Sequence, residues 1–237
     1  MAAEHAEHWM IPLNGLPAPF NQVNADTVLM AWFTMGLIAV IVLMIRRNLQ
    51  LQPGKLQTFG ESLFDFSRSI TTTTAGKRGD VFLFYIGSLF IFIVTANLLG
   101  QMPLRFIQLF WHYPGELAAA TGDFNTTAAL AILTLFMYFA FGIRAKGLRY
   151  FKHYLQPHFL FLPINIIEDV TRPFSLMLRL YANILVGEIL SMVAMSMCPY
   201  ILPVGVIFLE LFVAVIQAYI FAMLSSVYIS LLSEEHH

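Results

Sequence analysis

The chain has 237 residues, of which 58% are hydrophobic and 11% are charged, and its mean hydropathy is +0.72. An ordinary soluble domain is about 25% charged, so this chain lacks the polar surface that water on all sides would require. Its net charge of −1 offers no basic surface to a nucleic acid. Its single cysteine, Cys198, excludes an internal disulfide and a multi-cysteine metal site. The composition predicts an integral membrane protein in a lipid bilayer, with no nucleic-acid partner, no metal and no cofactor.

Five apolar segments are long enough to cross a bilayer, for which a helix needs about 20 apolar residues. Three of them have ordinary lengths and cover 27–46, 81–104 and 124–143. The other two, at 159–198 and 203–232, would run about 60 Å and about 45 Å as continuous helices. The hydrocarbon core is only about 30 Å thick, and average tilts of about 20° cannot absorb the excess. These two segments are therefore either broken or cross the membrane obliquely.

We expect an oblique hairpin that turns at Cys198-Pro199-Tyr200, with Pro173 placed to kink its first helix near one end. Such a pair is shaped to lie against something large and curved rather than to stand upright in a bundle. The predicted fold class is an all-α integral membrane protein, arranged as a single membrane domain over 1–237. It has five transmembrane helices, of which the last two form the long oblique hairpin, and an interfacial amphipathic helix.

The amphipathic helix is predicted at 55–70, between the first two spans. Apolar residues recur there at steps of three or four, at Leu56, Phe59, Leu63, Phe66 and Ile70. This spacing places them on one face of a helix. Such a helix is expected to lie along the cytoplasmic interface and anchor the chain there, with a lipid-sensing role as the alternative.

Lysine and arginine are concentrated in two connections of the chain. Between the first two spans lie Arg46, Arg47, Lys55, Arg68, Lys77 and Arg78, and between the third and fourth lie Arg144, Lys146, Arg149 and Lys152. The positive-inside rule makes both connections cytoplasmic. The polar N-terminal tail at 1–26, which does not resemble a cleavable signal peptide, is then outside and the C-terminus is inside.

The fourth apolar segment contains charged residues, and each costs roughly 2.5–3.5 kcal/mol near the centre of a bilayer on insertion scales. At 100° per residue, one helical stripe carries Glu168, Arg172, Arg179 and Asn183. Glu188 is half a turn away from Arg179 and points to the opposite side. The purely structural explanation of Arg179 would be a buried ion pair with Glu188 or Glu210, and the opposite faces argue against Glu188 as its direct partner.

The fifth segment carries a second stripe, made of Glu210, Gln217 and Tyr228. Ionisable residues inside membranes usually mark ion paths. An arginine has a permanent positive charge, so Arg179 cannot relay protons but can hold a fixed positive potential. Glu188 and Glu210 can be protonated or can ligate a hydrated cation, and they are therefore candidate stations on such a path.

Several longer stretches are distinctive. They are NLLGQMP at 97–103, TGDFNTTAALAI at 121–132, FLPINIIEDVTRPFSLMLRLYANILVGEI at 161–189, IQAYIFAMLSSVYIS at 216–230 and the terminal SEEH. With these stretches in this order, the chain resembles the a subunit of the F-type ATP synthase. That family is the membrane stator facing the rotating ring of c subunits, and the resemblance covers nearly the whole chain.

The resemblance implies roles for individual residues. Arg179 matches the essential arginine that faces the carboxylate of the c-ring and keeps ions from slipping between two half-channels. Glu188 matches the acidic residue of the outer half-channel, and Gln217 matches a glutamine near the arginine. Glu210 stands where the family carries histidine or glutamate, so a purely histidine-based relay is excluded here.

The resemblance also implies lining residues and partners. Glu168 and Asp169 are expected to line the inner half-channel. Arg172 and Tyr228, on the two polar stripes, are further candidates for lining a half-channel. The polar positions expected near the outer aqueous opening are Asn97, Asp123, Asn125 and Thr127. The implied partners are the c-ring, the b subunits of the peripheral stalk and the remaining F1Fo complex, in a bacterial inner membrane. No catalytic site is expected in this chain itself.

Two other functions are less consistent with the sequence. A secondary transporter would normally show internal repeats and paired broken helices, and neither is visible. An intramembrane hydrolase would need a nucleophile and a base, but no G-x-S-x-G or H-E-x-x-H occurs. His5 and His8 have a spacing that a metal could use, yet a solvated tail is the simpler interpretation.

Overall fold

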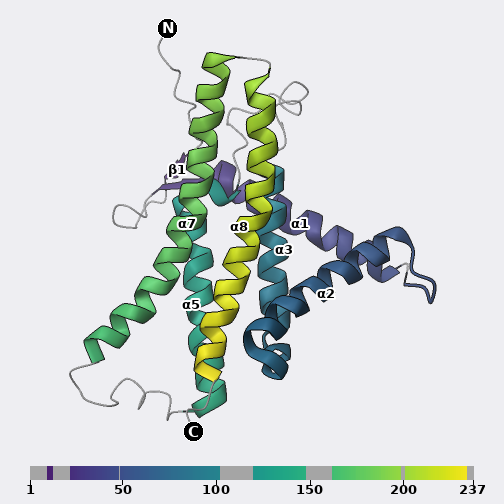
Figure 1. Cartoon of the computed structure of the whole chain (residues 1–237), viewed down its shortest axis with the longest axis vertical. Coiled ribbons are helices and arrows are strands. Elements are labelled where there is room, and N and C mark those ends of the chain that lie inside the picture. Colours follow the sequence, from purple (N-terminus) through teal and green to yellow (C-terminus); the bar gives the residue numbers. More distant parts are fainter. Residues whose placement is uncertain are drawn as a thin grey trace.

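A computed structural model describes the chain over residues 10–12, 22–47, 49–101, 120–147, 162–198 and 201–233. Five of its helices are long and apolar enough to cross a membrane, and a sixth, α2, is amphipathic (Figure 1). The predicted fold class is therefore confirmed. His5 and His8, for which a solvated tail was the favoured interpretation, and the terminal SEEH, apart from the backbone of Ser233, lie outside the described residues.

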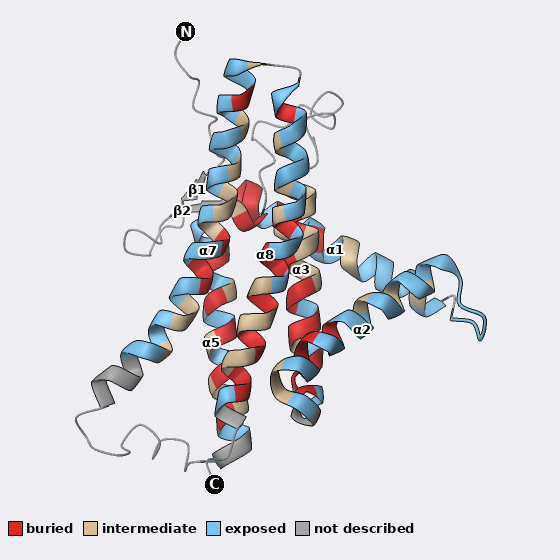
Figure 2. Ribbon diagram, in the orientation of Figure 1, coloured by how far each residue is buried: buried red, intermediate tan, exposed pale blue. Residues whose placement is uncertain are grey.

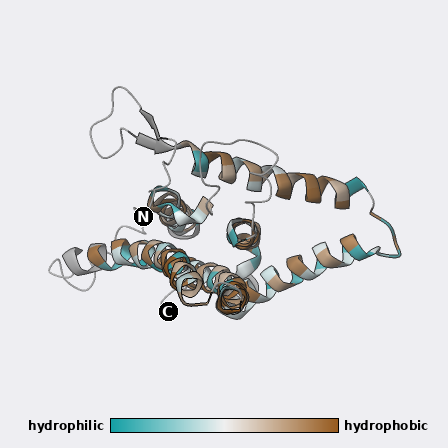
Figure 3. Ribbon diagram, turned by 90° about the horizontal axis from the view of Figure 1, so that it is seen from above, coloured by the Kyte–Doolittle hydropathy of each residue, from teal (hydrophilic) through white to brown (hydrophobic). Residues whose placement is uncertain are grey.

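Helix α1 (Ala25–Arg47) follows two short strands that the sequence did not predict, β1 (Met10–Pro12) and β2 (Gln22–Asn24). The strands pair antiparallel. Helix α1 is hydrophobic on all sides, and large side chains such as Trp32 are 68% exposed on it. A helix that is apolar all round and so little covered is suited to lipid. Figures 1 and 3 show that it runs across the long axis of the other spans rather than beside them.

Helix α2 (Lys55–Ala75) is longer than predicted and ends at Gly76, whose positive φ of 58° suits a glycine. A 3-10 turn, η1 (Gly76–Val81), links it to the next helix. The second half of α2 is more than an interfacial anchor, because it packs on α3 and α8. Ser67 lies there against Gly87, and Thr74 is hydrogen-bonded to Ser226 of α8.

Helices α3 (Leu83–Gln101) and α5 (Phe124–Lys146) run beside one half of α8 (Figure 1). A 3-10 turn, η2 (Ala120–Gly122), precedes α5. The Asp123 side chain caps α5 by accepting a hydrogen bond from the backbone N–H of Asn125 at 2.9 Å. The main core lies between these helices and the hairpin, and includes Phe82, Ile86, Phe90, Ile93, Leu176, Leu180, Phe221 and Ile229.

The last two helices form the hairpin. Helix α7 (Leu162–Met197) has 36 residues and α8 (Leu202–Ser233) has 32, which correspond to about 54 Å and about 48 Å. Both are continuous, so the alternative of broken segments is wrong. Helix α7 contains Pro173, and its N-terminal part swings away from α8 (Figure 1). Figure 2 shows that the half of the hairpin next to its turn is largely exposed, whereas the other half of α8 is buried.

Candidate functional site

Polar side chains of the hairpin gather in two groups, one on each side of Arg179 along α7. We call the first the Tyr138 cluster; it contains Tyr138, Glu168, Asp169, Arg172 and Tyr228. We call the second the Glu210 cluster; it contains Asn97, Gln101, Thr121, Glu188 and Glu210, and we group with them Gln217, which follows Glu210 by two helical turns on α8. Each cluster draws its residues from at least three elements of the fold.

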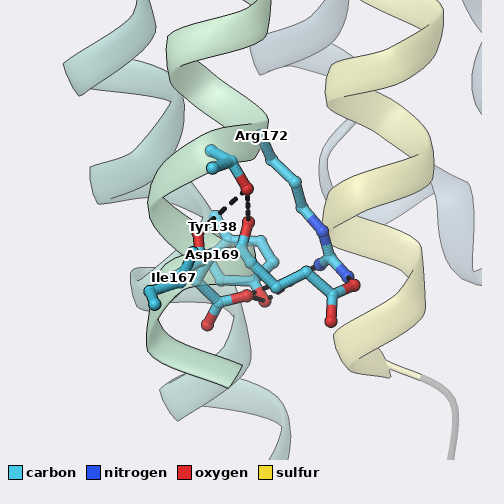
Figure 4. Close-up of polar contacts among 6 residues, drawn as sticks. Tyr138, Ile167, Asp169 and Arg172 are labelled. Atoms are coloured by element: carbon cyan, nitrogen blue, oxygen red, sulfur yellow. Dashed lines mark hydrogen bonds and ion pairs between the residues drawn. The ribbon is translucent and has the colours of Figure 1, made fainter. Parts of the chain in front are cut away.

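In the Tyr138 cluster, the hydroxyl of Tyr138 on α5 donates to Asp169 Oδ1 at 2.6 Å and accepts from Arg172 Nη1 at 3.3 Å (Figure 4). Arg172 also pairs with Glu168, and its Nη1 lies 3.6 Å from Asp169 Oδ1. The guanidinium carbon of Arg172 is 5.4 Å from the ring centroid of Tyr228 on α8, within the range of a cation–π contact. This arginine therefore joins three helices.

A cavity opens beside the Tyr138 cluster where α5, α7 and α8 meet. It is lined by Thr134, Leu135, Tyr138, Asp169, Arg172, Pro173, Leu176 and Tyr228. Polar and charged groups lie at one part of its wall, whereas Leu176 also belongs to the apolar core. The cavity thus extends from the charged groups to the edge of the core.

In the Glu210 cluster, two side-chain amides of α3 contact the backbone of α8. Gln101 Nε2 donates to the carbonyl of Glu210 at 3.0 Å, and Asn97 Nδ2 donates to the carbonyl of Ala214 at 3.4 Å. Thr121 in η2 donates from its hydroxyl to Asn97 Oδ1. These contacts fix α8 against α3 at the level of the half-buried Glu210 side chain.

The Glu210 side chain lies against the backbone of α7. A Cβ added to Gly187 would stand 3.2 Å from Glu210 Cδ and Oε1, so the missing side chain provides the space for this carboxyl group. The neighbouring Glu188 is exposed and close enough to Glu210 to act on it electrostatically. The two glutamates therefore form one acidic pair across the hairpin.

Three buried polar atoms of this cluster lack a hydrogen-bond partner among the described residues. They are Gln101 Oε1, Glu210 Oε1 and Gln217 Nε2. Leaving such groups unpaired costs about 1–3 kcal/mol each. Buried polar groups of this kind are commonly satisfied by ordered water. The Glu210 cluster is therefore suited to hold water or another small hydrogen-bonding species.

Between the two clusters lies an apolar layer. Leu176 and Leu180 of α7 face Ala218, Phe221 and Ala222 of α8 in the main core, and all five are almost completely buried. These residues fall between the two clusters along both helices. On α8 the layer is bounded by the buried side chain of Gln217 on one side and by the buried hydroxyls of Ser225 and Ser226 on the other.

Arg179 lies on α7 beside this layer but points outward. It is exposed, and within the described part of the chain no hydrogen bond or ion pair engages its guanidinium. Asn183, one turn further along α7, is half-buried, and Gln217 on α8 is buried. A permanent charge is thus presented on the outer surface of the hairpin.

The structure separates the remaining predicted positions. Asn97 joins the Glu210 cluster, but Asp123, Asn125 and Thr127 act at the start of α5, where Asp123 caps the helix and Thr127 donates to the carbonyl of Phe124. The sequence interpretation missed Tyr138, Gln101 and Thr121. Gln101 had a signal, since it follows Asn97 by one helical turn. Within the described ranges, no group of three or more His, Cys, Asp or Glu could hold a metal ion.

The fold and the site define a multi-pass helical membrane protein. Its longest helices, α7 and α8, hold one ionisable group between them, Glu210, and present another, Arg179, on their outer surface. A family model described as ATP synthase A chain matches residues 28–230. The chain is similar to ATP synthase subunit a, chloroplastic, from Stigeoclonium helveticum: 40% identical over 218 residues, which is 91% of this chain and 87% of that protein. The chain belongs to the ATP synthase A chain family, as its motifs predicted. Its members are membrane subunits of the Fo sector and have no catalytic site of their own.

Proposed function

We propose that this stator subunit forms two half-channels that load and unload the carboxylate of a c-subunit ring. In this way it couples the flow of H⁺ or Na⁺ across the membrane to rotation of the ring and to ATP synthesis. The observation that carries the proposal is the arrangement of two polar clusters separated by an apolar layer, with Arg179 exposed beside that layer. An ion can then pass from one cluster to the other only by way of a partner on the outer surface.

The Glu210 cluster is assigned to the outer half-channel. Glu188 is exposed and receives the ion, and Glu210 passes it on within the hairpin. Asn183 and Gln217 lie on either side of the route toward Arg179 and can hydrogen-bond water along it. The unpaired buried atoms of this cluster support a hydrated passage.

The Tyr138 cluster is assigned to the inner half-channel, with Glu168 and Asp169 as its carboxylates. A c-ring carboxyl that has taken up an ion is neutral and can cross lipid, where an unpaired charge would be costly. When it reaches Arg179, the positive charge favours the ionised carboxylate and the ion is released. The membrane potential supplies about 2.3 kcal/mol per charge per 100 mV, which drives the rotation.

The partners and the setting follow from the same assignment. The exposed face of α7 that carries Arg179 is the surface offered to the c-ring, and the b subunits of the peripheral stalk hold the chain in place. The excess of lysine and arginine in two connections supports an external N-terminus and a cytoplasmic C-terminus. A bacterial inner membrane is the proposed location, although the relative named above is chloroplastic.

The test is Arg179→Ala in the assembled complex, with ATP-driven ion pumping measured in membrane vesicles. Coupled pumping should be lost, because the fixed charge that separates the two half-channels is gone. Arg68→Ala is the matched control, since Arg68 forms an exposed ion pair with Asp80 at 3.5 Å. Undiminished coupled pumping by Arg179→Ala would disprove the assignment. Repeating the measurement with and without Na⁺ identifies the ion.

A further inference from the structure

Tyr138 enters its cluster from α5, and its hydroxyl lies between a carboxylate and a guanidinium (Figure 4). It donates to Asp169 at 2.6 Å and accepts from Arg172 at 3.3 Å, and the residue is only 5% exposed. A buried phenol that donates to one charged group and accepts from another fixes the positions of both. Hydrogen bonds to charged groups are also stronger than those between neutral groups.

The two carboxylates of the cluster differ in their surroundings. The Asp169 side chain is 12% exposed and is engaged by Tyr138 and Arg172. The Glu168 side chain is 56% exposed, although it also contacts Arg172. Exposed ion pairs are weak and readily exchanged for contacts with water. Glu168 is therefore the more accessible of the two carboxylates, whereas Asp169 is held in place.

The helix itself needs support at this point. Pro173 has no backbone N–H, so the carbonyl of Asp169 loses the hydrogen bond that residue 173 would otherwise donate. The part of α7 before Pro173 swings away from α8 (Figure 1). The contacts from Tyr138 on α5 and Tyr228 on α8 hold this weakened turn from outside.

We propose that Tyr138 is a positioning residue of the inner half-channel. It holds Asp169 and Arg172 beside the cavity at the edge of the apolar layer, and thereby leaves Glu168 as the carboxylate that exchanges ions with water. This inference rests on the proposed function, because it assigns separate roles to the residues of one of the two half-channels. Asp169 then has a structural task, and Glu168 has the transport task.

The test uses inverted vesicles that carry the assembled complex, with ATP-driven pumping measured against the outside ion concentration. Tyr138→Phe should lower the maximal rate about 2- to 10-fold, the range expected for one lost hydrogen bond, without changing the half-saturating ion concentration. Asp169→Asn should behave in the same way. Glu168→Gln should instead raise the half-saturating concentration. Tyr219→Phe, which removes a hydroxyl from a ring packed on Phe66, is the matched control and should pump normally.

Double variants show whether Tyr138 acts through the same contact as Asp169 and independently of Glu168. Tyr138→Phe should add little to Asp169→Asn, because both remove the same contact, whereas its effect should multiply with that of Glu168→Gln. A normal maximal rate in Tyr138→Phe, or a raised half-saturating concentration like that of Glu168→Gln, would overturn the inference. If Tyr138→Phe does not assemble, the contrast between Asp169→Asn and Glu168→Gln still decides it.

The same vesicles distinguish failure of this inference from failure of the proposed function. If Arg179→Ala abolishes coupled pumping while Tyr138→Phe pumps normally, only the role of Tyr138 is wrong. If Arg179→Ala retains coupled pumping, the half-channel assignment itself fails. The amount of the chain in each purified complex is measured in parallel, so that a loss of assembly is not mistaken for a loss of pumping.

Discussion

The apolar layer between the two clusters leads to a prediction about one of its residues, Leu180. This residue is fully buried, and replacing a buried leucine by alanine typically costs about 2–5 kcal/mol of stability. The cavity that remains would be walled by apolar neighbours, and cavities of that kind stay dry. Leu180→Ala should therefore destabilise the complex without opening a path for ions.

Leu180→Asn should act differently. Asparagine has nearly the shape of leucine, but its amide would be buried without a partner, which costs about 1–3 kcal/mol unless water enters. Water drawn into the layer would connect the cavity of the Tyr138 cluster with the Glu210 cluster. Ions would then leak past the rotor, and the gradient sustained per ATP hydrolysed should fall.

The assay compares the steady ion gradient with the rate of ATP hydrolysis in vesicles, and records the temperature at which each purified complex loses activity. Leu178→Ala is the matched control, because Leu178 is 41% exposed on the same helix. A leak in Leu180→Ala as large as that in Leu180→Asn would refute the reasoning that dryness forms the barrier. Full coupling in Leu180→Asn would show that the barrier lies elsewhere.

Two further predictions concern a carboxylate and a glycine. Glu188→Gln should slow ion translocation while assembly stays intact, because the exposed acidic group of the Glu210 cluster is lost. Glu61→Gln on α2 is the control. Normal flux in an assembled Glu188→Gln complex would remove Glu188 from the path. Gly79→Ala should destabilise the chain by roughly 1–3 kcal/mol, because a Cβ there would lie 2.5 Å from the backbone carbonyl oxygen of Thr71. Gly36→Ala meets nothing within 4 Å and should be tolerated; equal thermal stability of the two variants would contradict this explanation.

The helices could be predicted from the sequence because the patterns that indicate them are local. Runs of apolar residues indicated each span, and the spacing from Leu56 to Ile70 indicated the amphipathic helix. Whether the two longest segments were broken could not be decided from length alone, since packing along α3 and α5 determines it. The direction of α1 across the other spans also depends on tertiary contacts, and no local pattern encodes it.

The site was predictable where charge stood out from an apolar background. Arg179, Glu188 and Glu210 were visible for that reason. Tyr138 was not, because a tyrosine in an apolar span is ordinary, and its partner Asp169 lies 31 residues away in the sequence. Asn125 is exposed at the start of α5, where its backbone N–H donates to the capping side chain of Asp123.

The contacts between α3 and α8 have a consequence for how the hairpin is assembled. Asn97 and Gln101 are four residues apart, and so are the carbonyls of Glu210 and Ala214 that they bind. A shift of α8 along its axis by one residue would break both contacts at once, so α8 can occupy only discrete positions relative to α3. The height of Glu210 along the hairpin is therefore set by its neighbour α3. The positions that α8 can take against α3 are spaced one helical turn apart.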